Sequence, residues 1–163
     1  MGGQGQEEAQ MAVPRGTRFE VEHDQVFSEG AAIVGPVSAD MEYVSNEDKA
    51  RGKQPKQRID EHTGLLQWKV TVSDPSAEKD REKSVSLTIL AKVQPVPPET
   101  AIAGFDFRPV HFEGLTIEPR VMGEKFKYLG WVFRAVGMCA PNGAAKGHGK
   151  PLPAAPVTDK SAA

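Results

Sequence analysis

The sequence has very little cysteine, since Cys139 is the single one among 163 residues. One thiol forms no disulfide within the chain, and a zinc site of four cysteines, or of cysteines with histidines, lacks its ligands. No stretch approaches the roughly 18 consecutive apolar residues that a membrane helix requires. The first residues also lack the basic segment and apolar run of a secretion signal. We therefore expect a protein of the reducing cytoplasm that holds no metal ion.

Catalytic and nucleotide-binding patterns are also missing. The segment KGHGKP, residues 146–151, imitates the end of a phosphate-binding loop, but Ala144 stands where the first glycine belongs and Pro151 where serine or threonine is needed. Nothing indicates a base that would activate Cys139. The histidines show no HxxxH or HExxH spacing, and we expect them in solvated turns and tails: His23, His62, His111 and His148. The sequence thus predicts no enzyme, no catalytic residue and no cofactor.

Large apolar groups are scarce at both ends of the chain. Residues 1–15 and 141–163 consist mainly of glycine, alanine, proline, glutamine and lysine, which offer too little apolar surface to offset the entropy of ordering. We therefore predict a disordered tail at each end. The length between them suits one compact unit, so residues 16–140 are predicted to form a single domain.

A period of two between apolar and polar residues marks the strands of this domain. The first expected strand is 31–43, where Gly35 and Pro36 indicate either an edge position or a β-bulge. A second clear alternation covers 84–93 and is expected to pair with the strand before it. The polar connector between them, 74–83, is expected to form one short helical turn.

A hairpin is predicted around the turn DEHTG, residues 60–64. Gly64 supplies the positive φ that a tight turn requires. On the strand that follows, Trp68 shares one face with Val70 and Val72, while polar residues alternate on the other face. Trp68 is therefore predicted to lie in the core rather than to contact a nucleic-acid base.

The C-terminal part of the domain combines a proline-rich crossing with a final hairpin. The prolines of 94–114 argue against a central strand there, because proline lacks the N–H donor. Residues 115–122 and 125–138 are predicted to pair through a two-residue turn at Gly123 and Glu124. Both faces of the second arm carry bulky apolar groups, so one face is expected to be core and the other to need a cover.

These elements together predict an all-β fold of about five strands. A loop-rich crossing between the third and fourth strands favours a small antiparallel Greek-key barrel of the OB type. An open antiparallel sandwich is the alternative.

Charge is divided unevenly along the chain. Residues 1–48 carry ten acidic and two basic side chains, a net of −8, and the remaining 12 acidic and 18 basic side chains give a net of +6. Residues 49–69 alone hold six basic and two acidic groups, a net of +4. Because clustered cations attract polyanions, this stretch is a candidate contact region for nucleic acid.

Aromatic side chains lie among the basic ones in two places, on the hairpin after residue 56 and on the last strand. Lysine and arginine can follow phosphates while exposed aromatics stack on unpaired bases at about 1–3 kcal/mol each. Lys125 and Lys127 share the parity of Trp131 and Phe133, which favours that face of the last strand. The predicted nucleic-acid-binding residues are Lys56, Arg58, Lys69, Lys125, Lys127, Trp131, Phe133 and Arg134.

Several ordered motifs lie between residues 24 and 141: FSEGAAIVGPV, DEHTGLLQWKVTVSD, VQPVPPE, FRPVHFEGLTIEPRV and VFRAVGMCAP. Together they resemble a known family, the activators of replication, integration and excision of actinomycete integrative and conjugative plasmids. The resemblance implies a regulatory protein that raises expression of the plasmid's replication initiator, excisionase and integrase, with no catalytic residues. The longer segment 41–58 and both tails depart from the family pattern.

Two functions agree with these observations. The first is a non-enzymatic regulator that binds single-stranded or locally opened DNA, with the acidic N-terminal segment covering the basic face when DNA is absent. No helix-turn-helix is visible in the sequence, so activation need not require a DNA reader. The second function is an adaptor that acts on a replication initiator or a transcription regulator without touching DNA.

Overall fold

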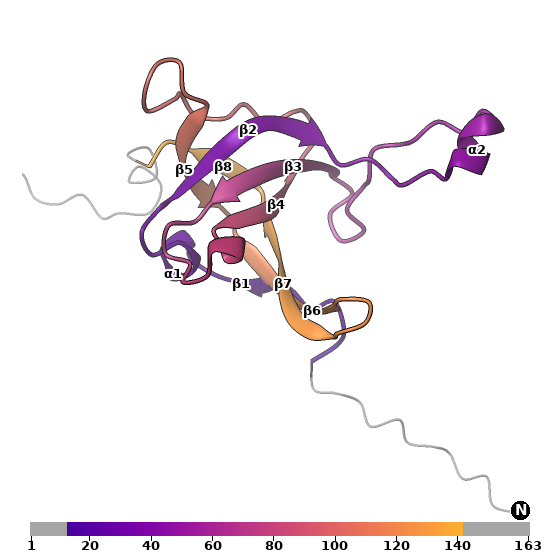
Figure 1. The fold of residues 1–163 in the computed structure, drawn as a ribbon, viewed down its shortest axis with the longest axis horizontal. Helices are drawn as coiled ribbons and strands as arrows, with labels where there is room; N and C mark the ends of the chain where they lie inside the picture. Colours follow the sequence, from indigo (N-terminus) through magenta and orange to yellow (C-terminus); the bar gives the residue numbers. More distant parts are fainter. Residues whose placement is uncertain (1–12, 142–163) are drawn as a thin grey trace, which may run out of the picture.

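The computed structural model describes residues 13–141, and these form one curled sheet of eight strands, a half-barrel with very little helix (Figure 1). The tails predicted at residues 1–15 and 141–163 fall almost wholly outside this range. No helix in the described part is long and apolar enough to cross a membrane. In chain order the elements are β1 (Phe19–Glu20), α1 (His23–Val26), β2 (Ala31–Ala39), α2 (Asn46–Ala50), β3 (Leu66–Ser73), the 3₁₀ turn η1 (Asp80–Glu82), β4 (Ser84–Ala91), β5 (Phe107–Glu113), β6 (Thr116–Met122), β7 (Tyr128–Ala135) and β8 (Gly137–Cys139).

The sheet confirms the all-β prediction but differs from the expected topology. Its strand order is β1-β6-β7-β4-β3-β2-β5-β8. All neighbours are antiparallel except β4 and β7, which run parallel, so the sheet is mixed. Eight strands replace the predicted five. The parallel pair could not be foreseen from alternation, which shows that a segment is extended but not what lies beside it.

One of the additional strands, β5, lies in the segment that the sequence predicted to be a crossing. Pro109 sits within β5 opposite Ala32 of β2. β8 pairs with residues 111–113 of β5, so within residues 13–141 the other flank of the strand has no neighbour at Pro109. A strand flank without a hydrogen-bonding neighbour tolerates a residue that has no N–H, and the prediction of an unpaired crossing is therefore wrong for this half of the segment.

β2 contains the irregularity that its glycine and proline predicted. Its pairing with β3 shifts register between Val34 and Ser38, and Gly35 has a φ of +81°, a left-handed conformation that glycine adopts without a steric penalty. The bulge is thus confirmed. The edge position is not, because β2 lies between β3 and β5.

The core occupies the face of the sheet to which Trp68 belongs. Val70, Val72, Leu87 and Ile89 are buried there, and Trp68 packs against them and donates its Nε1–H to the carbonyl of Ala91 at 3.0 Å. The predicted pairing of β3 with β4 is confirmed, with Trp68 opposite Ile89. Gly64 has the predicted positive φ, +71°. Trp68 is therefore partly buried against the core, on the face that its parity predicted.

Two loops complete the description of the sheet. The connector between β3 and β4 contains the expected single helical turn, η1. The turn of the β6–β7 hairpin was predicted wrongly, because Met122 pairs with Tyr128 and five residues, 123–127, join the strands. Lys127 closes this loop by donating from Nζ to the carbonyl oxygen of Gly123 at 2.8 Å.

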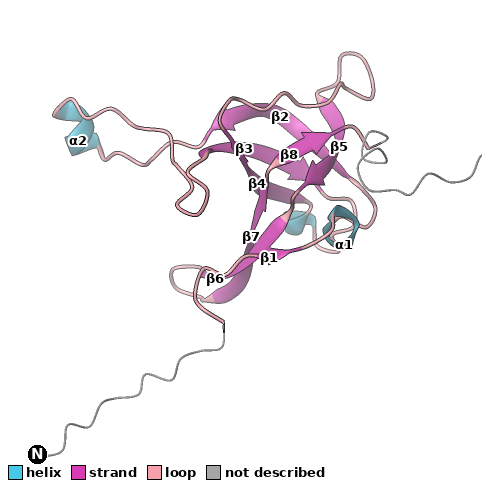
Figure 2. Ribbon diagram, turned by 180° about the vertical axis from the view of Figure 1, so that it is seen from behind, coloured by secondary structure: helices cyan, strands magenta, loops and turns pink. Residues whose placement is uncertain are grey.

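A long arm leaves the body between β2 and β3 and carries α2 at its far end (Figures 1 and 2). The side chain of Ser45 caps α2 by accepting from the backbone N–H of Asp48. The two limbs of the arm meet near its base, where Met41 and Gln57 form an isolated bridge. The arm is therefore an ordered projection, and no residue of α2 is buried.

Candidate functional site

The predicted binding residues do not form one face. Lys69, Thr88 and Arg134 are opposite one another across β3, β4 and β7, which places them on the same side of the sheet. Trp131 and Phe133 alternate with the residues of that side and point to the other. A strand of DNA lying against one side of the sheet would therefore meet only part of the predicted set.

Arg134 is not available for a phosphate. Its side chain is only 10% exposed, and its Nη1 lies 2.6 Å from Oε2 of Glu118, whose Oε1 accepts from Arg120 at 2.9 Å. Burial of the Glu118 carboxyl opposes its ionisation, but the hydrogen bonds from Arg120 and Arg134 outweigh this and lower its pKa. Arg134 thus belongs to a buried ion pair with Glu118, and the structure gives its predicted DNA contact no support.

The side chain of Phe133 packs within the protein. It packs against the core, with its ring centroid 6.4 Å from that of Phe27. Trp131, two residues earlier on the same face, is 45% exposed. Of the two aromatic residues predicted to stack on bases, Trp131 is the more exposed, and Phe133 is partly buried against the core.

A second buried ion pair, between Arg18 and Asp60, holds the hairpin turn against the N-terminal segment. Both carboxylate oxygens of Asp60 accept from Arg18, and Oδ2 also accepts from the backbone N–H and the hydroxyl of Thr63. The Arg18 hydrogen bond is the main reason that the pKa of Asp60 falls from 3.8 to about 2. Asp60 is therefore a structural anion whose partner lies 42 residues away.

Asp40 forms ion pairs with two of the predicted binding residues, Arg58 and Lys69. Its Oδ1 is 2.9 Å from Nζ of Lys69 and 3.7 Å from Nε of Arg58, while both basic side chains remain about half exposed. Among the acidic residues of the segment 1–48 that the structure describes, Asp40 alone forms ion pairs with the basic stretch 49–69. The predicted covering of the basic region by the N-terminal segment is thus limited to this carboxylate in the described part.

These ion pairs line a polar groove of about 830 Å³ between the base of the arm and β6–β7. Its walls hold equal numbers of arginines and carboxylates, so it is electrically balanced and does not attract a phosphate chain by net charge. The arginines are Arg15, Arg18, Arg58, Arg120 and Arg134, and the acids are Asp40, Glu42, Asp60, Glu61 and Glu118.

Unpaired cations gather instead on two projections. On the arm, no carboxylate among residues 13–141 forms an ion pair with the cations Lys49, Arg51, Lys53 and Lys56. At the tip of the β6–β7 hairpin, Lys125 and Lys127 flank Phe126, which is 87% exposed. We define these as the basic arm, residues 49–56, and the hairpin tip, residues 123–128.

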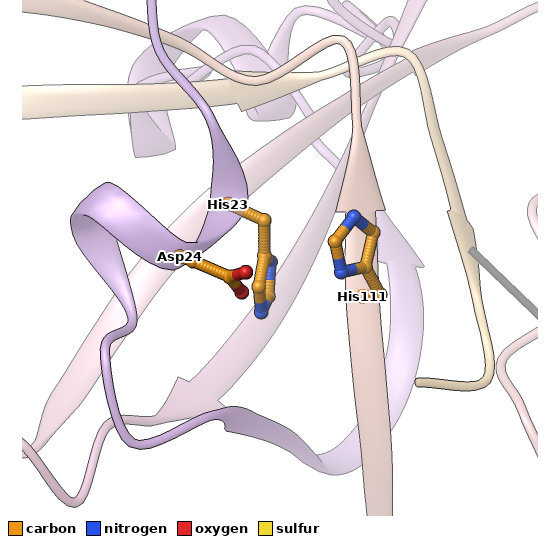
Figure 3. Close-up of side chains that lie close together, drawn as sticks. All are labelled: His23, Asp24 and His111. Atoms are coloured by element: carbon orange, nitrogen blue, oxygen red, sulfur yellow. The ribbon is translucent and has the colours of Figure 1, made fainter. Parts of the chain in front are cut away.

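Two histidines that are distant in the sequence lie next to each other where α1 meets β5 (Figure 3). His23 begins α1 and is buried, and its ring lies 4.3 Å, centroid to centroid, from that of His111 on β5. One ligand atom from each of His23, His111 and Asp24 lies within 4.8 Å of the others. His23 is therefore not the solvated turn residue that was predicted. The two are 88 positions apart, so their approach left no spacing signal in the sequence.

The hydrogen bonding of His23 argues against a metal ion in this cluster. Its Nδ1 accepts from the buried backbone N–H of Phe112 at 3.1 Å, so the proton of the neutral ring is on Nε2. A protonated Nε2 cannot bind a metal, and freeing Nδ1 would leave the Phe112 N–H without a partner. The cluster is best explained as structural, since it joins α1 to β5.

This arrangement predicts a pH-dependent stability. Burial, and then the neighbouring His111, lower the pKa of His23 below its usual 6.5, although Asp24 opposes them. The stability that neutral His23 provides is thus complete above pH 6.5 and decreases as the pH falls below it. His23→Ala should lower the free energy of unfolding by about 1–3 kcal/mol and reduce this pH dependence, measured by urea unfolding above and below pH 6.5. His62→Ala, in an exposed turn, is the control, and an equal effect of both variants would contradict the prediction.

Neither a family model nor a curated protein nor a solved structure matches the chain. The resemblance to plasmid activators accordingly stays a prediction from the sequence motifs.

Proposed function

We propose that the chain is a non-enzymatic regulatory protein that binds single-stranded or locally opened DNA through the basic arm and the hairpin tip. The observation that carries this proposal is the basic arm itself. Its four cations are held away from the body, without carboxylate partners in the described part of the chain. Cations that are already paired gain little from a phosphate, whereas solvated ones release counterions from DNA when they bind it.

Exposed aromatic side chains beside both projections support unpaired bases as the target. Tyr43, near the base of the arm, is 85% exposed, and Phe126 and Tyr128 are exposed at the hairpin tip. Rings of this kind stack on bases that are not paired in a duplex. OB-fold proteins also bind single strands with loops and strand surfaces. The likeness ends there, because the chain forms a mixed eight-stranded sheet and not the predicted five-stranded barrel.

The revised site keeps part of the predicted set. Lys56 belongs to the basic arm, and Lys125 and Lys127 to the hairpin tip. Arg58 and Lys69 lie half exposed beside Asp40 and serve as secondary contacts near the arm's base. Within the resemblance to plasmid activators, DNA binding by these groups would promote replication, integration and excision of the element.

The basic arm gives a quantitative test. Replacing Lys49, Arg51, Lys53 and Lys56 together with alanine should weaken binding to labelled single-stranded DNA by at least about tenfold at low salt. The slope of log K against log salt should fall by about 3, since each phosphate contact contributes about 0.7 with single strands. Fluorescence anisotropy at several salt concentrations measures both quantities, and duplex DNA of the same sequence shows the strand preference.

A control variant that loses the same number of positive charges elsewhere distinguishes direct contacts of the arm with DNA from an effect of net charge. Alanine at Lys79, Arg81, Lys83 and Lys92 also removes four positive charges, but none of these lies on the arm or the tip. It should leave the salt slope close to that of the unmodified chain. Equal loss in the two variants, or no binding of either form of DNA by the unmodified chain at low salt, would exclude the proposed site.

A further inference from the structure

The sheet is split between β4 and β7, and the split forms a groove. The two strands pair only where Leu87–Ile89 meet Phe133–Ala135. Before this contact both strands continue, β4 from Ser84 and β7 from Tyr128, without pairing to each other. A groove of about 700 Å³ lies between them, with the connector that contains η1 as its third wall.

The groove exposes backbone as well as apolar side chains. β6 pairs with β7 along its whole length, but on the opposite flank residues 128–132 of β7 have no strand neighbour among residues 13–141. Each extended residue offers N–H and C=O groups at such a flank. Leu129 and Trp131 stand beside this open flank, and Val85 of β4 lines the facing wall.

We propose that this groove accepts an extended peptide segment of a partner protein, which adds to the open flank of β7 as a further strand. A strand satisfies the free N–H and C=O groups in register, which neither a nucleic acid nor a small apolar molecule can do along several residues. Alternate side chains of the peptide point toward the groove. The peptide carries apolar side chains at those positions, because Trp131, Leu129 and Val85 form the adjacent walls.

The site shares one residue with the proposed DNA contacts, Tyr128, which ends the hairpin tip and also lines the groove. Trp131 lies at the groove, whereas the cations of the arm lie on a separate projection (Figure 1). The groove explains why the large ring of Trp131 is left accessible, although the next residue on the same face of β7, Phe133, packs against the core. Partly buried tryptophans at the centre of a groove are frequent sources of binding energy at protein interfaces.

Selection from a library of phage-displayed random decapeptides, on the immobilised full chain, supplies the probe. The selected peptides are synthesised with a fluorescent label, and their affinity is measured by anisotropy. Trp131→Ala should weaken binding by about tenfold or more. Val121→Ser is the matched control, because Val121 is an exposed residue of the same hairpin but does not line the groove, and it should leave the affinity unchanged.

Backbone pairing has a separate signature. Peptides that are N-methylated at alternate residues keep their side chains but lose every second N–H donor, so one of the two alternating sets should abolish binding. Binding that survives both sets, failure to select any peptide, or equal loss with Val121→Ser would overturn the proposal. Displacement of the peptide by oligothymidine, together with equal loss of DNA binding in Trp131→Ala, would assign the groove to nucleic acid instead. Loss of DNA binding in the arm variant alone, with the peptide still bound, leaves this proposal standing.

Discussion

Replacing Asp60 with alanine is expected to lower the free energy of unfolding by about 3–5 kcal/mol, because it leaves a largely buried arginine without its counter-ion. Arg18 is 15% exposed in its side chain and Asp60 is 1% exposed. The variant also removes the acceptor of two hydrogen bonds from Thr63 in the hairpin turn. Chemical denaturation at neutral pH measures the difference.

The lowered pKa of Asp60 accounts for part of the stability that Asp60→Ala should lose. Its pKa is about 2 in the folded chain against an ordinary 3.8, a difference worth on the order of 2 kcal/mol. This stability is complete above pH 3.8 and is lost as the pH falls through about 2. The rest of the expected loss in Asp60→Ala comes from the uncompensated Arg18.

Two variants make the Asp60 prediction specific. Asp60→Asn keeps the size and one acceptor oxygen, so it should fall between the unmodified chain and Asp60→Ala. Asp106→Ala removes a carboxylate that forms an exposed ion pair with Arg108, and such pairs contribute about 0–1 kcal/mol. A loss in Asp60→Ala no larger than in Asp106→Ala would show that the Arg18 pair does not hold the turn.

Phe27→Ala is the second variant with a large expected effect, a loss of about 3–5 kcal/mol in the free energy of unfolding. Phe27 is 1% exposed and lies within the core, where its ring is 5.9 Å from that of Phe112 and 5.2 Å from that of His23, centroid to centroid. Removing the ring loses buried apolar area and leaves a cavity where α1 meets the sheet. Thermal or chemical unfolding, with Phe105→Ala as the exposed control, measures the loss.

Phe27→Ala, combined with Phe133→Ala, also tests whether Phe133 serves to pack the core. Both rings belong to one cluster, so substitutions at the two positions should not be additive in stability. If Phe133 instead served mainly as a stacking platform, Phe133→Ala would weaken DNA binding without affecting stability. Additive effects of the two substitutions would mean that the contact between the rings contributes nothing.

Local patterns predicted several parts of the fold correctly. The alternation around Trp68 gave its core position, Gly64 gave the turn, and Gly35 with Pro36 gave the bulge. Each of these depends on a few consecutive residues, either on the period of two in a strand or on a positive φ. Pro109 misled the same reasoning, because its effect depends on whether a neighbouring strand is present at that point.

The candidate site was predicted only in part for a related reason. Charge and aromatic content pointed to the basic stretch and the hairpin tip, where the structure leaves the basic side chains exposed. Arg134 looked equally suitable in the sequence, but Glu118, on the neighbouring strand, neutralises it. Whether an arginine is free or paired depends on the residues of the neighbouring strand, here a diagonal neighbour, and alternation along its own strand does not indicate these.

The sequence by itself determined that this chain is mostly β, that Gly64 lies in a tight turn and where its cations concentrate. Only the tertiary structure decided that β4 and β7 pair in parallel over a few residues and then separate, which leaves the flank of β7 open beside Trp131. It also decided that His23 accepts from Phe112 across 89 positions. Strand propensity and charge are properties of short segments, whereas register and pairing depend on which distant segments the folded chain brings together.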